Sequence, residues 1–280
     1  MNYNEKLAEA VTRSGSVLCI GLDPSEENIP HEITASTTST VEAAFEFCRQ
    51  TIEITADTTA AYKLNSAYFE AFGAEGFQAM ATLRDQLPGH VISVADAKRG
   101  DVPHTAERYK VAFFDRLGFD AITLSPLPGT DSILPYLTDP SKGCYILALT
   151  SNPGASDFFL QKVEDGITLS EYITRKMARL SRNVQSTLGL VIGATQYQYS
   201  ENLLEEFAGG HLLMPGIGAQ NANPDQLINL VSRHSCKPLI PVSRGIMKAH
   251  SNSDVDWKTA VSSSAREYNQ MFKTFAKLHG

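Results

Sequence analysis

The chain has 280 residues, of which 42% are apolar and 20% charged, and its formal net charge is −7. This composition is typical of a globular protein with a substantial core, and the negative balance argues against a general nucleic-acid-binding or acidic-membrane surface. No apolar run approaches the roughly 20 residues of a membrane span, and the 4 cysteines show no CxxC or metal-ligand spacing, so we expect a cytoplasmic protein with buried, reduced thiols.

Short apolar runs recur along the chain, and each is followed by turn residues and a longer amphipathic segment. The runs occupy residues 17–20, 60–62, 91–95, 121–124, 145–149, 190–192, 212–214 and 239–242. Helical patterns lie between them at 41–55, 71–87, 106–117, 169–180, 201–207 and 224–231, and a last amphipathic segment covers 255–278. This alternation predicts an α/β protein with parallel strands closed into a (β/α)8 TIM barrel, with a doubly wound open sheet as the alternative fold. No low-complexity tract divides the chain, so we expect a single domain over residues 1–280.

Charged residues gather where two of these strands end. Asp96, Lys98 and Asp101 directly follow the third run, and Lys63 directly follows the second. An alternating strand would project Asp96 and Lys98 from one face, and a turn at Gly100 would allow Asp101 to swing back towards them. Burying such charges is costly unless they are paired, and the carboxyl ends of barrel strands carry active sites, so this group indicates catalysis.

Other strand ends add polar groups to the same mouth of the barrel. Asp23 follows the first strand, Ser151 the fifth and Arg244 the eighth. The seventh strand is followed by residues 215–220, whose glycines would let backbone N–H groups approach an anion beside Arg244. The sequence therefore predicts a phosphate site formed by the ends of the last two strands.

The pattern Asp96-x-Lys98-x-x-Asp101, with Lys63 upstream, resembles the charged tetrad of orotidine 5'-phosphate decarboxylase, in particular the longer bacterial branch of that family. Further runs resemble the family in the same order along the chain, at residues 22–24, 63–70, 150–155, 215–220 and 243–245. The resemblance implies a carbon–carbon lyase that converts orotidine 5'-monophosphate into uridine 5'-monophosphate (UMP) and carbon dioxide, without cofactor or metal, as the last step of de novo UMP biosynthesis.

The resemblance also assigns roles to individual residues. Lys98 would donate a proton to the C6 carbon and Asp96 would orient Lys98 beside the departing carboxylate. Lys63 and Asp23 would hold ribose hydroxyls and Ser151 the pyrimidine edge, while the phosphate would be bound by Gln220 and Arg244.

Asp101 and Thr105 match family residues that reach into the neighbouring subunit's site, which implies a homodimer. Two segments depart from the family pattern, residues 125–129 after the fourth strand and residues 221–223 after the seventh. The first departure bears on packing at the rim or dimer face, and the second on the phosphate loop. The length of the chain leads us to expect that the phosphoribosyltransferase fused to this activity in some organisms is a separate chain.

Simpler and rival interpretations remain open at this point. Asp101 before Val102 and Pro103 is also typical of a helix N-cap. A sugar-phosphate decarboxylase of the same barrel type would use Asp23, Asp96 and Asp101 as Mg2+ ligands. A Schiff-base aldolase and a non-catalytic nucleotide-binding barrel are the remaining alternatives. Lysines flanked by carboxylates stay protonated, which disfavours the Schiff base.

Overall fold

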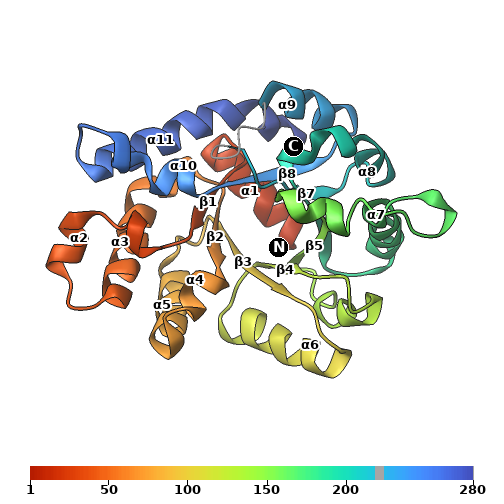
Figure 1. The fold of residues 1–280 in the computed structure, drawn as a ribbon, viewed down its shortest axis with the longest axis horizontal. Helices are drawn as coiled ribbons and strands as arrows, with labels where there is room; N and C mark the ends of the chain where they lie inside the picture. Colours follow the sequence, from red (N-terminus) through yellow and green to blue (C-terminus); the bar gives the residue numbers. More distant parts are fainter. Residues whose placement is uncertain (218–223, 280) are drawn as a thin grey trace.

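Eight parallel strands form a closed barrel in the order of the sequence, as the alternating pattern predicts (Figure 1). The computed structural model describes residues 1–217 and 224–279, apart from the side chains of Glu164, Pro224 and Asn252. The strands are β1 (Leu18–Leu22), β2 (Ala61–Asn65), β3 (Ile92–Arg99), β4 (Ala121–Leu124), β5 (Gly143–Leu149), β6 (Thr187–Ile192), β7 (His211–Leu213) and β8 (Lys237–Val242). The open-sheet alternative is wrong, because β1 pairs with β8 and closes the barrel. The single domain over residues 1–280 stays a prediction.

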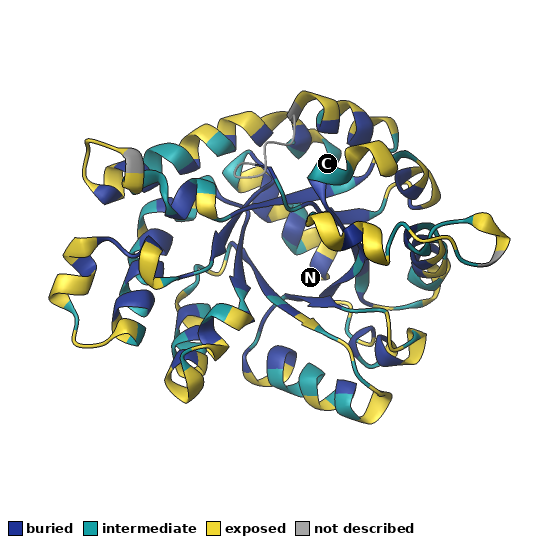
Figure 2. Cartoon of the chain, viewed as in Figure 1, coloured by how far each residue is buried: buried dark blue, intermediate teal, exposed yellow. Residues whose placement is uncertain are grey.

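Helices surround the barrel and turn their apolar faces towards it, so that buried positions line the strands and exposed positions face outward (Figures 1 and 2). The longer helices are α3 (Thr40–Thr55), α5 (Gly73–Gln86), α6 (Pro103–Lys110), α7 (Leu169–Leu180), α9 (Pro224–Arg233) and α11 (Trp257–Phe272). Shorter ones are α2 (His31–Ser36), α4 (Ser66–Glu70), α8 (Glu201–Glu206) and α10 (Arg244–Met247). α6 continues as a π-helical turn, η3 (Val111–Arg116), and α11 as a 3₁₀ segment, η11 (Lys273–His279). The bounds of the longer helices and of α8 lie close to the predicted helical segments.

Four described helices have no counterpart among the predicted elements, namely the short α2, α4 and α10 and one longer helix near residue 1. α1 (Tyr3–Ser14) begins at a capping box formed by Asn2 and Glu5 and lies across the amino-terminal end of the barrel (Figure 1). Its Tyr3 is fully buried, and the Tyr3 hydroxyl lies 3.1 Å from that of Tyr145 on β5. Gly143 makes this packing possible, since a Cβ there would lie 2.6 Å from the Tyr3 ring. α1 therefore closes the end of the barrel opposite the predicted site.

The cysteine prediction is confirmed, because all 4 cysteines are buried and none forms a disulfide. Burial raises the pKa of the Cys19 thiol to about 12, so this side chain behaves as a small apolar group. No helix in the described part of the chain has the length and apolar character needed to cross a membrane.

Candidate active site

A cavity of about 230 Å³ opens at the carboxyl ends of the strands and brings several predicted site residues together. Its polar wall comes from β2, β3 and β4 and from the segment after β5. Its apolar wall comes from β5, β6, β7 and β8 and from the residues directly after β7. The lining residues are Lys63, Asp96, Lys98, Thr123, Leu147, Thr150, Ser151, Asn152, Val191, Leu213, Pro215 and Pro241. The cavity thus joins a charged face to an apolar face, the arrangement expected of a site for a planar, charged ligand.

Asp96 is the centre of the charged face. Its Oδ1 lies 2.7 Å from Lys98 Nζ and its Oδ2 lies 2.9 Å from Lys63 Nζ, so a single carboxylate bridges two ammonium groups. Oδ1 also accepts a hydrogen bond of 3.0 Å from the Thr123 hydroxyl. The side chains of Lys63 and Asp96 are 8% and 12% exposed, whereas that of Lys98 is 47% exposed. Lys98 is therefore the cation that an incoming ligand can reach most easily.

The charge states of this group follow from burial and pairing. Burial by itself would raise the pKa of Asp96, but Lys63 and Lys98 more than offset this and hold that pKa well below its usual range. Burial would likewise lower the pKa of Lys63, but Asp23 and Asp96 outweigh it and raise that pKa above its ordinary value. Asp96 is thus a carboxylate and Lys63 an ammonium at neutral pH.

The backbone around Lys98 differs from the regular strand that the sequence predicts. β3 continues past its apolar run to Arg99, so Asp96 and Lys98 lie within the strand and Asp101 lies just beyond it. Lys98 has a φ of +47°, in the left-handed region that a side chain rarely adopts, and the pairing of β3 with β4 shifts register between Ala95 and Arg99. Asp96 and Lys98 meet as predicted, but through this irregular turn of the backbone and not through simple alternation.

Asp23 and Ser151 also lie at this mouth of the barrel. Asp23 Oδ1 is buried and lies 3.6 Å from Lys63 Nζ, too far for a hydrogen bond, and no other described residue donates a hydrogen bond to it. Ser151 lines the cavity, and its carbonyl accepts a hydrogen bond of 3.0 Å from the hydroxyl of Thr195. Gly193 lies so close that a Cβ there would be 2.6 Å from the Ser151 Cα. The residues that follow β6 therefore pack against the Ser151 backbone and fix its position on the cavity wall.

The predicted phosphate residues fall outside the cavity or outside the described residues. Arg244 begins α10, directly after β8, and its side chain is exposed and does not line the cavity. Gln220 and the departing segment 221–223 lie outside the described residues. The pairing of Gln220 with Arg244 at a phosphate stays a prediction.

Asp101 does not join the charged group of its own chain. Among the described residues, the ion pairs of Lys63 and Lys98 are with Asp23 and Asp96, and Asp101 makes none. Its Oδ1 accepts a hydrogen bond of 2.8 Å from the N–H of Val102. The N-cap interpretation is wrong, because Val102 occupies the cap position of α6 and carries no side-chain cap bond. Thr105 lies in the first turn of α6 and is partly exposed.

Sequence reasoning missed Thr123 and the apolar wall of the cavity. Thr123 sits inside the apolar run of β4 and is 1% exposed, and its hydroxyl contacts both Asp96 and the Lys98 backbone. A hydroxyl within an apolar barrel strand was the available signal. Leu147, Val191 and Leu213 gave none, because apolar residues in strands are equally consistent with an ordinary core.

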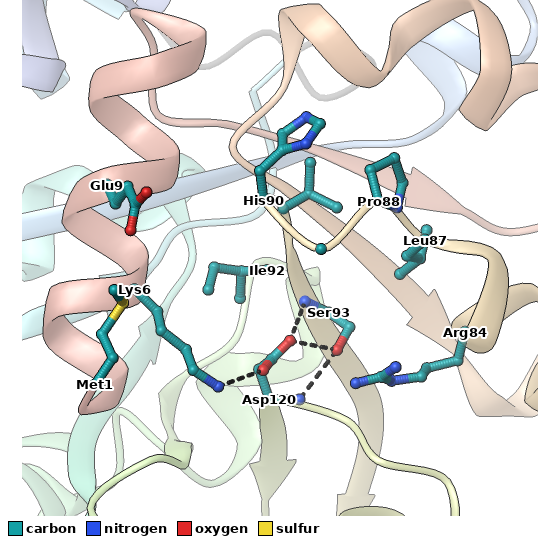
Figure 3. A pocket seen from close by; sticks show the side chains of 12 residues that line it. Met1, Lys6, Glu9, Arg84, Leu87, Pro88, His90, Ile92, Ser93 and Asp120 are labelled. Atoms are coloured by element: carbon teal, nitrogen blue, oxygen red, sulfur yellow. Dashed lines mark hydrogen bonds and ion pairs between the residues drawn. The ribbon is translucent and has the colours of Figure 1, made fainter.

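A larger cavity, of about 510 Å³, lies at the opposite end of the barrel beside α1 (Figure 3). Its Asp120 accepts hydrogen bonds from the Ser93 N–H and hydroxyl at 3.0 and 2.7 Å and lies 3.3 Å from Lys6 Nζ. The Asp120 carboxylate is thus already paired with protein groups, as is typical of an ion pair that stabilises the fold. Barrel enzymes place their chemistry at the carboxyl ends of the strands, so we assign the active site to the smaller cavity.

The metal-dependent alternative finds little support in the donor set. Within residues 1–217 and 224–279, no three or more His, Cys, Asp or Glu side chains are grouped so as to hold a metal ion. Both oxygens of Asp96 face ammonium groups, whose charge would oppose a dication at the same place. The geometry favours an electrostatic site built from lysine and aspartate.

Comparison with known proteins agrees with this geometry. The sequence model of the orotidine 5'-phosphate decarboxylase / HUMPS family matches residues 16–258. The chain is 38% identical over 259 residues to orotidine 5'-phosphate decarboxylase of Variovorax paradoxus and 36% identical over 258 residues to that of Dehalococcoides mccartyi, covering 91% of this chain and 92% of each relative.

Solved structures give the same result. An orotidine-monophosphate decarboxylase structure from Toxoplasma gondii superposes with a TM-score of 0.87 at 29% identity, covering 99% of this chain and 97% of the other. The OMP decarboxylase of Leishmania donovani superposes with a TM-score of 0.79 at 32% identity, covering 97% of this chain and 99% of the other. With the barrel, the bridged lysines and these relatives in agreement, the chain belongs to the orotidine 5'-phosphate decarboxylase family.

Proposed function

We propose that this protein decarboxylates orotidine 5'-monophosphate to UMP and carbon dioxide. The observation that carries the proposal is the Asp96 carboxylate, which bridges Lys63 and Lys98 in the cavity at the carboxyl ends of the strands. The named activity of relatives that share more than a third of their residues with this chain supports the same reaction.

The charged face fits the chemistry of the step. When the bond between C6 and the carboxylate breaks, the electron pair stays on C6 in the plane of the ring, where the ring π system cannot delocalise it. An ammonium group fixed beside that carbon offsets the developing charge in a largely buried site and then donates its proton to form the C6–H bond. We assign this role to Lys98, which lies 2.7 Å from Asp96 and is the more exposed of the two lysines.

The remaining polar groups would bind the nucleotide around the reacting carbon. Asp23 Oδ1 is buried and receives no hydrogen bond from the part of the chain that the structure describes, so a ribose hydroxyl beside Lys63 would satisfy it. Ser151, on the cavity wall, would contact the pyrimidine edge. Gln220 and Arg244 would bind the phosphate, whose binding free energy can help to position the reacting carbon.

A homodimer completes this proposal, with Asp101 and Thr105 serving the partner subunit's site. Asp101 makes no ion pair among the described residues of its own chain, although it lies close in sequence to Lys98. Val102 and Leu127 are 60% and 65% exposed, so both offer apolar surface to a partner. The segment with Leu127 lies against the motif, since a Cβ on Gly100 would come within 3.4 Å of Pro128 Cδ. An apolar face beside Asp101 is what a subunit interface there would require.

The test follows the absorbance of orotidine 5'-monophosphate with purified, EDTA-treated protein. We expect turnover that does not depend on added Mg2+. A flat trace from folded protein would refute the proposal, and activity that returns only with Mg2+ would instead support a metal-dependent decarboxylase.

Lys98→Ala separates catalysis from binding. We expect kcat to fall by about 10²-fold to 10⁴-fold or more, because the proton donor is lost. The affinity for UMP should change by less than about fivefold, because a half-exposed ion pair contributes at most about 1 kcal/mol. A variant that keeps the kcat of the unaltered protein would contradict the role of Lys98.

A further inference from the structure

The bulge between β3 and β4 leaves part of the catalytic motif without regular partners on β4. Ala95 pairs with Ile122 and Arg99 pairs with Leu124, so that Asp96, Ala97 and Lys98 on β3 stand opposite Thr123 alone on β4. Regular pairing resumes beyond this point, where the Ser125 N–H donates to the Arg99 carbonyl at 2.8 Å. Backbone groups inside a bulge need other partners, because an unpaired buried N–H is costly.

The Thr123 side chain supplies that partner. Its Oγ1 accepts a hydrogen bond of 3.0 Å from the Lys98 N–H and donates one of 3.0 Å to Asp96 Oδ1. The direction of both bonds is fixed, because a backbone N–H can only donate and an ionised carboxylate can only accept. Thr123 is 1% exposed, so water does not compete for either bond.

The same hydroxyl acts where the backbone is strained. The φ of +47° at Lys98 is unfavourable for a residue with a side chain, and such conformations persist only where surrounding contacts enforce them. Lys98 is held at two points, by the ion pair of its side-chain Nζ with Asp96 and by the hydrogen bond of its backbone N–H to Thr123. Both anchors depend on Thr123, since its hydroxyl also holds the Asp96 carboxylate.

We propose that Thr123 is a positioning residue for the decarboxylation, which holds the Lys98 backbone in its left-handed conformation and the Asp96 carboxylate between the two lysines. This inference rests on the proposed function of the site. Thr123 takes no proton and supplies no charge. It determines where the Lys98 ammonium lies relative to the reacting carbon, and displacements of about 1 Å can reduce a rate about 10²-fold.

The test compares Thr123→Val with Thr123→Ser. Valine has nearly the shape of threonine but can form neither hydrogen bond, whereas serine can form both. We expect Thr123→Val to lower kcat about 10-fold to 100-fold, as the loss of hydrogen bonds to a charged carboxylate and to a backbone N–H implies. Thr123→Ser should restore kcat to within about threefold of the unaltered protein, because both bonds can form again.

A matched control removes a buried threonine hydroxyl elsewhere. Thr174 in α7 is fully buried, does not line the cavity, and has a hydroxyl with no hydrogen-bond partner among the described residues, so Thr174→Val makes the same chemical change outside the site. We expect its kcat to be unchanged. If Thr123→Val does not fold, Thr123→Ala provides the same loss of both bonds without a methyl group against the Lys98 N–H.

A binding measurement separates positioning from direct contact with the ligand. We expect the affinity of Thr123→Val for UMP, measured by calorimetry, to stay within about threefold of that of the unaltered protein. The reason is that misplacing Lys98 weakens stabilisation of the transition state and not binding of the product. A fall in UMP affinity as large as the fall in kcat would overturn the positioning role, and so would a Thr123→Val rate equal to that of Thr174→Val. An inactive unaltered protein would instead refute the proposed function.

Discussion

Replacing Asp96 with asparagine tests the central ion pairs of the site. Oδ1 of Asp96 faces Lys98 and Thr123, and Oδ2 faces Lys63. An asparagine that keeps its oxygen at the Oδ1 position turns its NH2 group, a donor, towards the Lys63 ammonium. Among the described residues, Lys63 then retains a single carboxylate partner, Asp23, at 3.6 Å. The substitution therefore leaves a largely buried cation with one poorly placed partner.

The magnitude follows from how far each pair is buried. Breaking a buried ion pair costs about 3–5 kcal/mol. The pair with Lys98 adds at most about 1 kcal/mol, because that side chain is 47% exposed and its charge is screened by water. Since Lys63 keeps Asp23, we expect Asp96→Asn to lower the free energy of unfolding by about 3 kcal/mol.

Urea unfolding followed by circular dichroism measures this difference. Asp85→Asn is the matched control, because the Asp85 side chain is 80% exposed and lies 4.0 Å from Arg84. This substitution should change the free energy of unfolding by no more than about 0.5 kcal/mol. The pKa of Asp96 is lowered in the folded protein, so its contribution is complete above the ordinary value of 3.8 and is lost only as pH falls below it. The difference between Asp96→Asn and the unaltered protein should thus be equal at pH 7 and pH 5. An Asp96→Asn variant as stable as Asp85→Asn would refute this reasoning.

Three other predictions concern the surroundings of the site, the pH dependence of folding and the dimer. Gly193→Ala should raise KM for the nucleotide about 5-fold to 100-fold in steady-state assays. The added Cβ would lie 2.6 Å from the Ser151 Cα, and overpacking of this kind costs about 1–3 kcal/mol. An unchanged KM would contradict the view that Gly193 positions Ser151. Burial lowers the pKa of His211 to about 3 and of His279 to about 4, so stability is complete above the ordinary value of 6.5 and falls as pH decreases towards those values. Between pH 7 and pH 5, the free energy of unfolding of His279→Gln, measured with urea, should therefore fall by about 2 kcal/mol less than that of the unaltered protein. An equal fall in both proteins would show that His279 does not cause this pH dependence. Leu127→Glu replaces an apolar side chain that is 65% exposed with a charge in the proposed dimer interface. Sedimentation should then show a weaker dimer, and the activity per subunit should fall on dilution. An unchanged sedimentation profile would argue against this interface.

The sequence predicted the strand and helix order well because the barrel repeats one simple pattern. Apolar runs separated by amphipathic segments identify parallel strands and crossover helices, and α7 (Leu169–Leu180) has the predicted bounds. The two strands that carry the charged face proved longer than their apolar runs. β2 continues through Lys63 to Asn65 and β3 through Lys98 to Arg99, because pairing with neighbouring strands and ion pairing overcome the low strand preference of charged residues.

The residues of the charged face could be identified from sequence, since their types and spacing reflect their chemistry. The spacing placed Asp96, Lys98 and Lys63 together, and the structure joins them within 2.9 Å. Tertiary structure alone decided how they meet. The bulge opposite Thr123 and the left-handed backbone at Lys98 arise from the register of two strands in a closed barrel, and that register depends on contacts between residues far apart in the chain. A local pattern of residues therefore specifies the chemistry of this site, while its geometry depends on long-range pairing.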